Sequence, residues 1–525
     1  MASQGETRTT GSVLPARAGR REWIGLTVIA LPCMLYSMDL TVLNLAVPHI
    51  SADLKPSSSQ LLWIVDIYGF LIAGSLITMG TLGDRLGRRR LLLIGAAAFG
   101  AASVLAAFST SAEMLIASRA LLGIAGATLA PSTLSLIRNM FLDPAQRTVA
   151  IGVWVTSYSV GGAIGPLLGG VLLEYFWWGS VFLLGVPIMV LLLVLGPVLL
   201  PEFRDPQAGR LDLLSAAQSL AAVLLVIYGL KKLAQDGLSW PPTLSIVAGL
   251  AIGILFVHRQ RTLTHPLIDL RLFRDPAFSA SLATYTLGTL VAFGVYIFIA
   301  QYLQLVLGLS PLKAGLATVP SMAAYIVGSI VVPAIARRVR PANVMGAGLV
   351  ISAVGFGLLT QVDRTSSLIV LITGSIFYSL GLSPVVILAT DLIVGSAPVE
   401  RAGAASAISE TSSELGGALG IAIFGSIGTA VYRRAMWDAV PGNVPPEAME
   451  AARSTLGGAV AVAEQLPRGL GTELLGTARE AFTQAFQLTA AISAGVVLIT
   501  ALLATVLLRR VRIDSALEER AESLS

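Results

Sequence analysis

The chain has 525 residues, of which 55% are hydrophobic and only 12% are charged, and its mean hydropathy is +0.80. Because soluble domains carry about 25% charged residues, this composition excludes an ordinary soluble protein and indicates one that lies within a lipid bilayer. The net charge of +5 is too small to predict binding to nucleic acid, and the single cysteine, Cys33, excludes a disulfide framework within the chain.

Apolar windows of about 20 residues, the length of helix that crosses a ~30 Å hydrocarbon core, recur from near residue 24 to residue 508. The first window is too long for a signal-peptide core, and no small-residue cleavage site follows it. We therefore predict an all-α integral membrane protein with fourteen transmembrane helices. Their approximate ranges are 24–47, 60–81, 90–109, 112–138, 148–172, 179–200, 212–231, 242–258, 277–303, 312–336, 341–361, 366–394, 401–431 and 480–508.

Basic residues divide unequally between the two sets of short loops. One set holds Arg85, Arg88, Arg89, Arg90, Arg138, Arg147, Arg204, Arg210, Arg259, Arg261, Arg271, Arg274, Arg337, Arg338, Arg340 and Arg401. The other holds only Lys55, Lys231, Lys232, Lys313 and Arg364. Since cytoplasmic loops carry the excess of lysine and arginine, we expect the first set and both termini in the cytoplasm. The protein is then a multi-pass protein of the cell (inner) membrane, in contact with the lipid bilayer. The polar stretch 432–479 is expected outside, and its alanine-rich part EAMEAARSTLGGAVAVAEQL at 447–466 is expected to form an amphipathic helix or a helical hairpin.

Three charged residues lie inside the first, second and fourth predicted spans. Asp39 is about fifteen residues into a span that starts in the cytoplasm, roughly 22 Å from that surface at 1.5 Å per residue. Asp66 and Arg119 start from the opposite surface and lie roughly 9 and 11 Å below it. All three share the outer half of the bilayer. Because a lone charge at a helix centre costs about 2.5–3.5 kcal/mol, we expect each to face a cavity, to find a partner, or both.

The fifth span contains GGAIGPLLGG at residues 161–170. Gly161, Gly165 and Gly169 recur every four residues, so they line one face of the helix and let a neighbouring helix approach closely. Pro166 removes one backbone hydrogen bond and favours a bend there.

A second acidic pair lies in the thirteenth span. The i, i+4 spacing of Glu410 and Glu414 puts both on one helix face, roughly at mid-depth. Like charges so close disfavour double ionisation, so at least one is expected to hold a proton at neutral pH. Asp391, near the inner end of the twelfth span, is interpreted as an interfacial residue.

Aromatic residues near these acids favour bulky lipophilic cations as ligands, through charge and cation–π attraction. They are Tyr36, Trp63, Tyr68, Tyr158, Tyr296, Tyr302 and Tyr378.

Internal repetition predicts the domain organisation. GTLGDRLGRRR at 80–90 has a degraded counterpart in PAIARRVRP at 333–341, and GGAIG at 161–165 matches GGALG at 416–420. These matches fall at the second and fifth helices of two six-helix halves, 22–201 and 266–512, with two helices inserted between them at 202–265. The segments 1–21 and 513–525 are polar cytoplasmic tails. Such repeats, with a site between them at the midplane, are typical of transporters.

The sequence resembles the fourteen-helix drug:proton antiporters of the major facilitator superfamily over about residues 22–510. The motifs that carry the resemblance are GTLGDRLGRRR, RALLGIAGATLAP at 119–131, GGAIGPLLGG, MDLTVLNLAVP at 38–48, WIVDIY at 63–68, HPLIDLRLFRDPAF at 265–278 and SAISETSSELGGALG at 406–420. The resemblance implies two functional motifs. The gating motif comprises Gly80, Asp84, Arg85, Gly87, Arg88 and Arg89, with Asp84 as a latch of the inner gate. The helix 5 antiporter motif comprises Gly161, Gly165, Pro166, Gly169 and Gly170.

These observations predict a proton-driven exporter. Asp39, Asp66, Arg119, Glu410 and Glu414 are the predicted proton-coupling and substrate-binding residues, and the expected cargo is amphipathic cations such as quaternary ammonium compounds and dyes. The sequence has no Walker loop, no metal-ligand spacing and no nucleophile with a base, so we expect no enzyme activity and no cofactor or metal, with the proton gradient as the driving force. The protein is expected to be a monomer. Two alternatives stay open: export of an endogenous lipid or secondary metabolite, and a membrane receptor or sensor that does not transport.

Overall fold

The computed structural model describes residues 17–56, 58–204, 212–236, 239–264, 266–309, 311–363, 367–398, 401–437, 449–450, 452–453 and 455–509. Across these ranges the regular structure is helical and contains no strand, as predicted. The helices before the predicted insertion are α1 (Arg20–Leu54), α2 (Ser58–Leu86), α3 (Arg88–Ala107), α4 (Ala112–Gly126), α5 (Leu129–Met140), α6 (Pro144–Tyr175), α7 (Ser180–Leu183) and α8 (Gly185–Leu199). Next come α9 (Leu213–Asp236) and α10 (Trp240–Thr262). The remainder are η1 (Leu272–Arg274), α11 (Pro276–Gln301), the π-helical turn η2 (Tyr302–Val306), α12 (Pro311–Ala336), α13 (Pro341–Leu359), α14 (Ser367–Ser396), α15 (Ala402–Trp437), α17 (Leu456–Gln465) and α18 (Arg468–Leu507).

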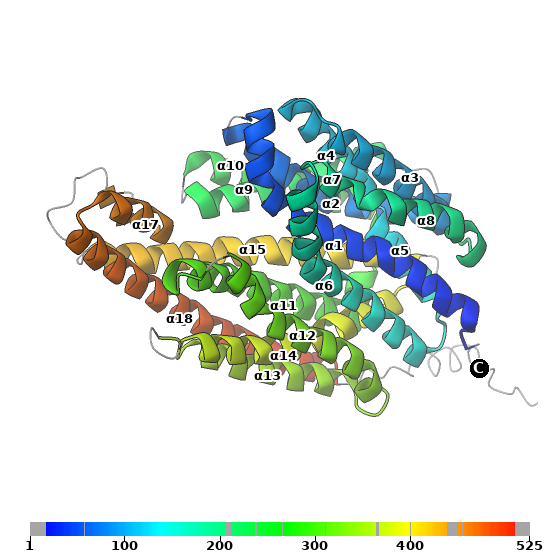
Figure 1. Ribbon diagram of the computed structural model, residues 1–525. Helices are drawn as coiled ribbons and strands as arrows, with labels where there is room; N and C mark the ends of the chain where they lie inside the picture. The colour runs from blue at the N-terminus through cyan, green and yellow to red at the C-terminus, as the bar shows by residue number, and fades with distance from the viewer. Residues whose placement is uncertain are drawn as a thin grey trace, which may run out of the picture.

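The helices form two packed groups (Figure 1). In the first group α1 packs on α6 and α8, and α4 packs on α2 and α3. In the second group α11 packs on α15, while α13 lies between α14 and α18. The two groups meet along two seams, where α2 contacts α15 and where α6 contacts α12.

The two glycine segments that match in the sequence make equivalent contacts. A Cβ at Gly161 of α6 would overlap the Met34 carbonyl oxygen of α1, and a Cβ at Gly420 of α15 would overlap the Leu290 carbonyl oxygen of α11. Each segment therefore lets the fifth helix of its group touch the backbone of the first. Of the other motif residues, Gly169 lies against Val42 of α1, Gly165 is buried, and the Pro166 side chain lies outside the described residues.

The helices α9 and α10 form a separate hairpin, and α9 contacts both groups by packing on α2 and α15. At its base Asp212, just before α9, accepts a hydrogen bond of 2.7 Å from Nε of Arg259 on α10. This guanidinium lowers the pKa of Asp212 to about 2, so the pair is ionised at neutral pH. The buried Gln260 binds Ser215 of α9 and the backbone of Leu267, and so joins the hairpin to the segment before α11.

The number of spans is confirmed only in part. In the described residues, twelve helical segments are long and apolar enough to cross a membrane, rather than the predicted fourteen. The helices α1 and α6, which are 35 and 32 residues long, are not among the twelve, and each contains side chains outside the described part.

In the described part of the polar stretch 432–479, α17 lies within the alanine-rich part and forms a hairpin with the start of α18, which lies beyond that part. The helix α18 begins at Arg468, whereas the predicted last span begins at 480, and α17 packs back on it. A Cβ at Gly471 of α18 would overlap the Ala463 carbonyl oxygen of α17, so the two helices touch closely. This hairpin lies at the end of the molecule away from the deep-blue start of α1 (Figure 1).

Both seams are tight at the other end, which we call the arginine-rich end because Arg88, Arg147 and Arg401 lie there. A Cβ at Gly80 of α2 would lie 2.6 Å from the Gly403 carbonyl oxygen of α15. One at Gly152 of α6 would lie 2.9 Å from the Ser329 carbonyl oxygen of α12. The two groups are therefore in backbone contact at this end along both seams.

Candidate transport site

A buried ion pair joins α1 and α4. Nη1 of Arg119 lies 2.7 Å from Oδ2 of Asp39, and the two side chains are 1% and 12% exposed. Nε of Arg119 donates to the Ile64 carbonyl oxygen of α2 at 3.1 Å, and its guanidinium lies 4.7 Å from the Tyr68 ring centre. The arginine is therefore held on three sides, and Asp39 supplies the countercharge that its burial requires.

Tyr68 connects this ion pair to an aromatic cluster between the two helix groups. The ring of Tyr36 lies 6.2 Å from Tyr68 and 5.5 Å, edge on, from Tyr158 of α6. Trp154 extends the cluster by packing 4.8 Å from Tyr158. The hydroxyls of Tyr68 and Tyr158 are buried and have no hydrogen-bond partner in the described part of the chain.

The second helix group presents its acids to this cluster. The Tyr36 hydroxyl donates to Oε1 of Glu414 on α15 at 3.4 Å. Glu410, one turn earlier, has a buried Oε1 with no hydrogen-bond partner among the described residues. It lies within electrostatic range of Glu414 and of Tyr158. The two carboxylates and the tyrosines thus face one another across the contact between the groups.

This arrangement can hold a cation. Carboxylates attract it directly, the faces of aromatic rings add cation–π attraction, and unpartnered buried hydroxyls supply polar contacts. Tyr68 packs on Arg119 of the ion pair and on Tyr36, which bonds Glu414, so the ion pair and the acidic pair border the same aromatic cluster.

The other predicted aromatic residues lie elsewhere. Trp63 is 40% exposed and packs on Phe70, and Tyr296 is 47% exposed on α11. Tyr302 is buried at the end of α11, where its hydroxyl donates to the Asp363 carbonyl oxygen, and Tyr378 stacks on Phe356. The Asp66 side chain lies outside the described residues, so its predicted role stays a prediction.

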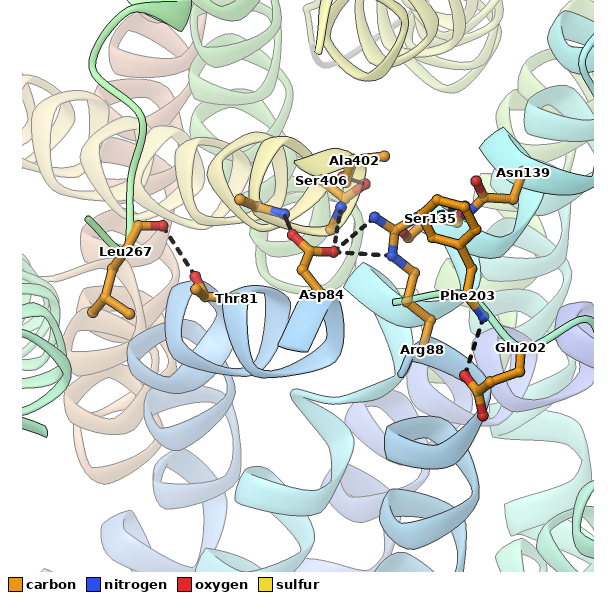
Figure 2. A network of polar contacts seen from close by, with 12 residues as sticks. Thr81, Asp84, Arg88, Ser135, Asn139, Glu202, Phe203, Leu267, Ala402 and Ser406 are labelled. Carbon is orange, nitrogen blue, oxygen red and sulfur yellow. Dashed lines mark hydrogen bonds and ion pairs between the residues drawn. The ribbon is translucent and has the colours of Figure 1, made fainter. Parts of the chain in front are cut away.

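Asp84 links the two groups at the arginine-rich end (Figure 2). Its Oδ1 lies 2.7 Å from Nη2 of Arg88, and its two oxygens accept hydrogen bonds from the backbone N–H groups of Gly403 and Ala404 at 3.2 and 3.1 Å. These two residues are in the first turn of α15, where a carboxylate is favoured by the helix dipole. A carboxylate on α2 therefore caps a helix of the other group.

The rest of the gating motif supports Asp84 from the first group. Gly87 has φ of +105°, a backbone conformation that requires glycine between α2 and α3. Arg88 also donates to the Ser135 carbonyl oxygen of α5, and Arg89 donates to the carbonyls of Pro197 and Leu200 at the end of α8. Arg85 lies in the last turn of α2.

A second bridge between the two groups, which the sequence reasoning missed, joins α14 to α6. Asp391 of α14 is only 2% exposed, and it accepts hydrogen bonds of 2.6 Å from Nε of Arg147 and from the Thr148 hydroxyl of α6. The interpretation of Asp391 as an interfacial residue is wrong, because its carboxylate is buried against the other group. An acid three residues before a predicted cytoplasmic helix end was the available signal, since acids contribute little to orientation.

Comparison with known proteins gives one consistent relationship. Residues 29–421 match the family described as Major Facilitator Superfamily. The chain is 44% identical over 500 residues to the multidrug efflux pump LfrA of Mycolicibacterium smegmatis, covering 95% of this chain and 99% of that one. It is 36% identical over 467 residues to the methyl viologen resistance protein SmvA of Salmonella typhimurium, covering 88% and 93%. The crystal structure of the human organic anion transporter MFSD10 superimposes with a TM-score of 0.60 at 17% identity, over 92% and 99% of the two chains.

Proposed function

The chain belongs to the major facilitator superfamily, and from that premise we propose that it is a proton-coupled multidrug exporter of lipophilic cations, including quaternary ammonium compounds and dyes. Membership makes it a multi-pass membrane transporter of small molecules and not an enzyme. The extent of its identity to a multidrug efflux pump and to a methyl viologen resistance protein supports a cationic cargo. The observation that carries the proposal is the set of two acids and three tyrosines at the contact between the helix groups.

We assign different tasks to the two charged sites. Glu410 has a buried Oε1 with no hydrogen-bond partner among the described residues, and Glu414 contacts the same tyrosine cluster through Tyr36, so we assign both acids to binding of the cation. Asp39 is neutralised by Arg119 in this conformation. When the helices move and the pair separates, the isolated carboxylate favours a proton, because burial disfavours its charged form. A proton gradient then drives the cycle without any cofactor, and Asp66 is a further proton-coupling residue.

We propose that the polypeptide crosses the inner membrane fourteen times and acts as a monomer with both termini in the cytoplasm. The lengths of α1 and α6 support two spans beyond the twelve. On this topology 22–201 and 266–512 are the two six-helix halves, 202–265 is the inserted pair, 1–21 and 513–525 are the cytoplasmic tails, and 432–479 is external. The arginine-rich end is then cytoplasmic, and the contacts of Asp84 and Asp391 close this conformation toward the cytoplasm.

Two other functions are separated from this one by measuring flux. Purified protein in liposomes is expected to move a monocationic dye across the bilayer, whereas a receptor on the same fold binds the dye without moving it. An exporter of an endogenous lipid or secondary metabolite is expected to leave the dye in place and to collect a cargo from liposomes loaded with cell extract.

The acidic pair predicts a dependence on the charge of the cargo. A dication needs more countercharge than a monocation in a site of low dielectric constant. We expect Glu410→Gln and Glu414→Gln to reduce export of methyl viologen by about tenfold, equivalent to ~1.4 kcal/mol, and export of a monocationic dye by much less. Efflux from everted vesicles with matched expression measures both.

Gly495→Ala is a suitable control, because a Cβ there meets nothing within 4 Å. It is expected to export both cations like the wild type. If the glutamine variants lose export of both cations equally, Glu410 and Glu414 serve proton coupling or helix packing rather than the cargo. If export of both cations is unchanged, their role is in helix packing only.

A further inference from the structure

The two seams between the helix groups differ in what covers them. We call the α2–α15 contact the covered seam, because α9 packs on both of its helices, and the α6–α12 contact the bare seam, because neither α9 nor α10 packs on it. Both are tight at the arginine-rich end, as the contacts of Gly80 and Gly152 show. The difference lies toward the other end.

The covered seam is filled by apolar side chains over the part that lies away from the arginine-rich end. A buried cluster unites Phe70 and Ala73 of α2, Ala418 and Ala422 of α15, and Val223, Ile227 and Leu230 of α9. A Cβ at Gly74 of α2 would lie 2.5 Å from the Leu220 side chain of α9, so the contact is close. The inserted hairpin therefore seals this seam against the bilayer.

The bare seam opens along its length. Gly170 follows Gly152 on α6 by 18 residues, and Gly315 precedes Pro333 on α12 by 18 residues. Eighteen residues are five turns of 3.6, so each pair lies on one helix face. Gly152 and Pro333 touch each other at the tight end, whereas a Cβ at Gly170 or at Gly315 would meet nothing within 4 Å. The facing surfaces of α6 and α12 thus separate toward the end away from the arginines.

The edges of this opening suit a lipophilic molecule. Val171 and Leu316, next to the two glycines, are 54% and 56% exposed. Pro320 inside α12 interrupts its hydrogen bonding between the open end and the tight end, which favours a bend there. The opposite part of α6 carries Tyr158, so the same helix borders the opening and the cation site.

We propose that the bare seam is the lateral route by which lipophilic cargo exchanges between the bilayer and the cation site, and that the inserted hairpin closes the equivalent route on the other side. The inference rests on the proposed function. A cation with a long alkyl chain concentrates in the membrane, because every CH₂ group that moves from water into lipid favours partition into the bilayer. The seam allows its charged head to reach the acids while its chain stays among lipid chains.

Bulk placed in the seam tests the route. Val171→Trp and Gly315→Trp, singly and together, introduce rings at the edges of the opening, where Val171 is 54% exposed and a Cβ at Gly315 meets nothing within 4 Å. Val171 lies just outside the antiporter motif, which ends at Gly170. The cargoes are a long-chain and a short-chain alkyltrimethylammonium, which carry the same head and charge and differ only in partition into the bilayer. In proteoliposomes we expect the double variant to export the long-chain cation at least about tenfold more slowly than the wild type, equivalent to ~1.4 kcal/mol, with short-chain export within about twofold.

Gly357→Trp on α13 and Gly495→Trp on α18 are the matched controls, because a Cβ at each also meets nothing within 4 Å and neither helix borders the seam. Both are expected to export both cations normally. Unchanged long-chain export in the double variant, or equal loss of both cations, would overturn the route while leaving the exporter intact. A wild-type protein that moves neither cation would overturn the proposed function and the route together.

Discussion

Asp39→Asn is expected to abolish export of every cation, because it removes the carboxylate proposed to exchange the proton. It also leaves the buried Arg119 without its countercharge, and breaking a buried pair in this way costs about 3–5 kcal/mol. The single variant is therefore expected to lose thermal stability as well as export. Gradient-driven dye efflux and the melting temperature of purified protein measure the two effects.

The double variant Asp39→Asn/Arg119→Gln separates proton transfer from structural support. Replacing both charges removes the unpaired guanidinium, and neutral replacements of a buried pair are often tolerated. We expect the melting temperature to recover toward that of the wild type while export stays at background. Asp39→Glu keeps a carboxylate and is expected to retain pH-dependent export. Recovery of gradient-driven export in the double variant would show that the ion pair supports the structure and does not exchange the proton.

Asp84→Asn is expected to open the arginine-rich end. Hydrogen bonds to a charged group contribute about 1.5–3 kcal/mol each, and Asp84 accepts two from the start of α15. Loss of even one such contribution changes the ratio of closed to open molecules by about tenfold or more. Gly403→Ala is expected to act in the same direction from the other group, because its Cβ would overlap the Asp84 carboxylate.

A buried cysteine measures this opening. Ser406 is fully buried one turn into α15, close to Asp84 in Figure 2. In a Cys33→Ser background, Ser406→Cys is expected to react with a water-soluble maleimide about tenfold faster when Asp84→Asn or Gly403→Ala is added. Gly357→Ala, on a glycine that faces open space, is expected to leave the rate unchanged. A constant rate in both gate variants would contradict the role of Asp84 as a latch.

Much of this arrangement could be predicted because the membrane restricts spanning segments to apolar helices and makes buried charges costly. The apolar windows predicted helices throughout, and the cost of buried charge predicted that Asp39 and Arg119, at similar depth, would find partners. The structure pairs them with each other. The spacing of Gly161 and Gly169 predicted a close helix contact, and α6 does lie against α1 at both positions.

The features that the sequence did not predict depend on which way a side chain points around its helix axis. In a span that is apolar on all sides, sequence gives the depth of a side chain but not the neighbour that it faces, because periodicity is absent. Depth alone therefore grouped Tyr296 and Tyr378 with Tyr158, although they lie on other faces. For the same reason, the packing of α9 against α2 and α15 could not be predicted from the sequence.

The proposed exchange of cation for proton is tested most directly by using a cation gradient to drive proton movement. Purified protein is reconstituted with a pH-sensitive dye inside the liposomes, and an outward gradient of a monocation is imposed with no initial pH difference and with the membrane potential clamped. As the cation leaves, an antiporter is expected to carry protons into the liposome and to acidify the lumen, and the Asp39→Asn protein is expected to leave the lumen pH constant. Cation movement in the wild type with no change in lumen pH would contradict proton coupling.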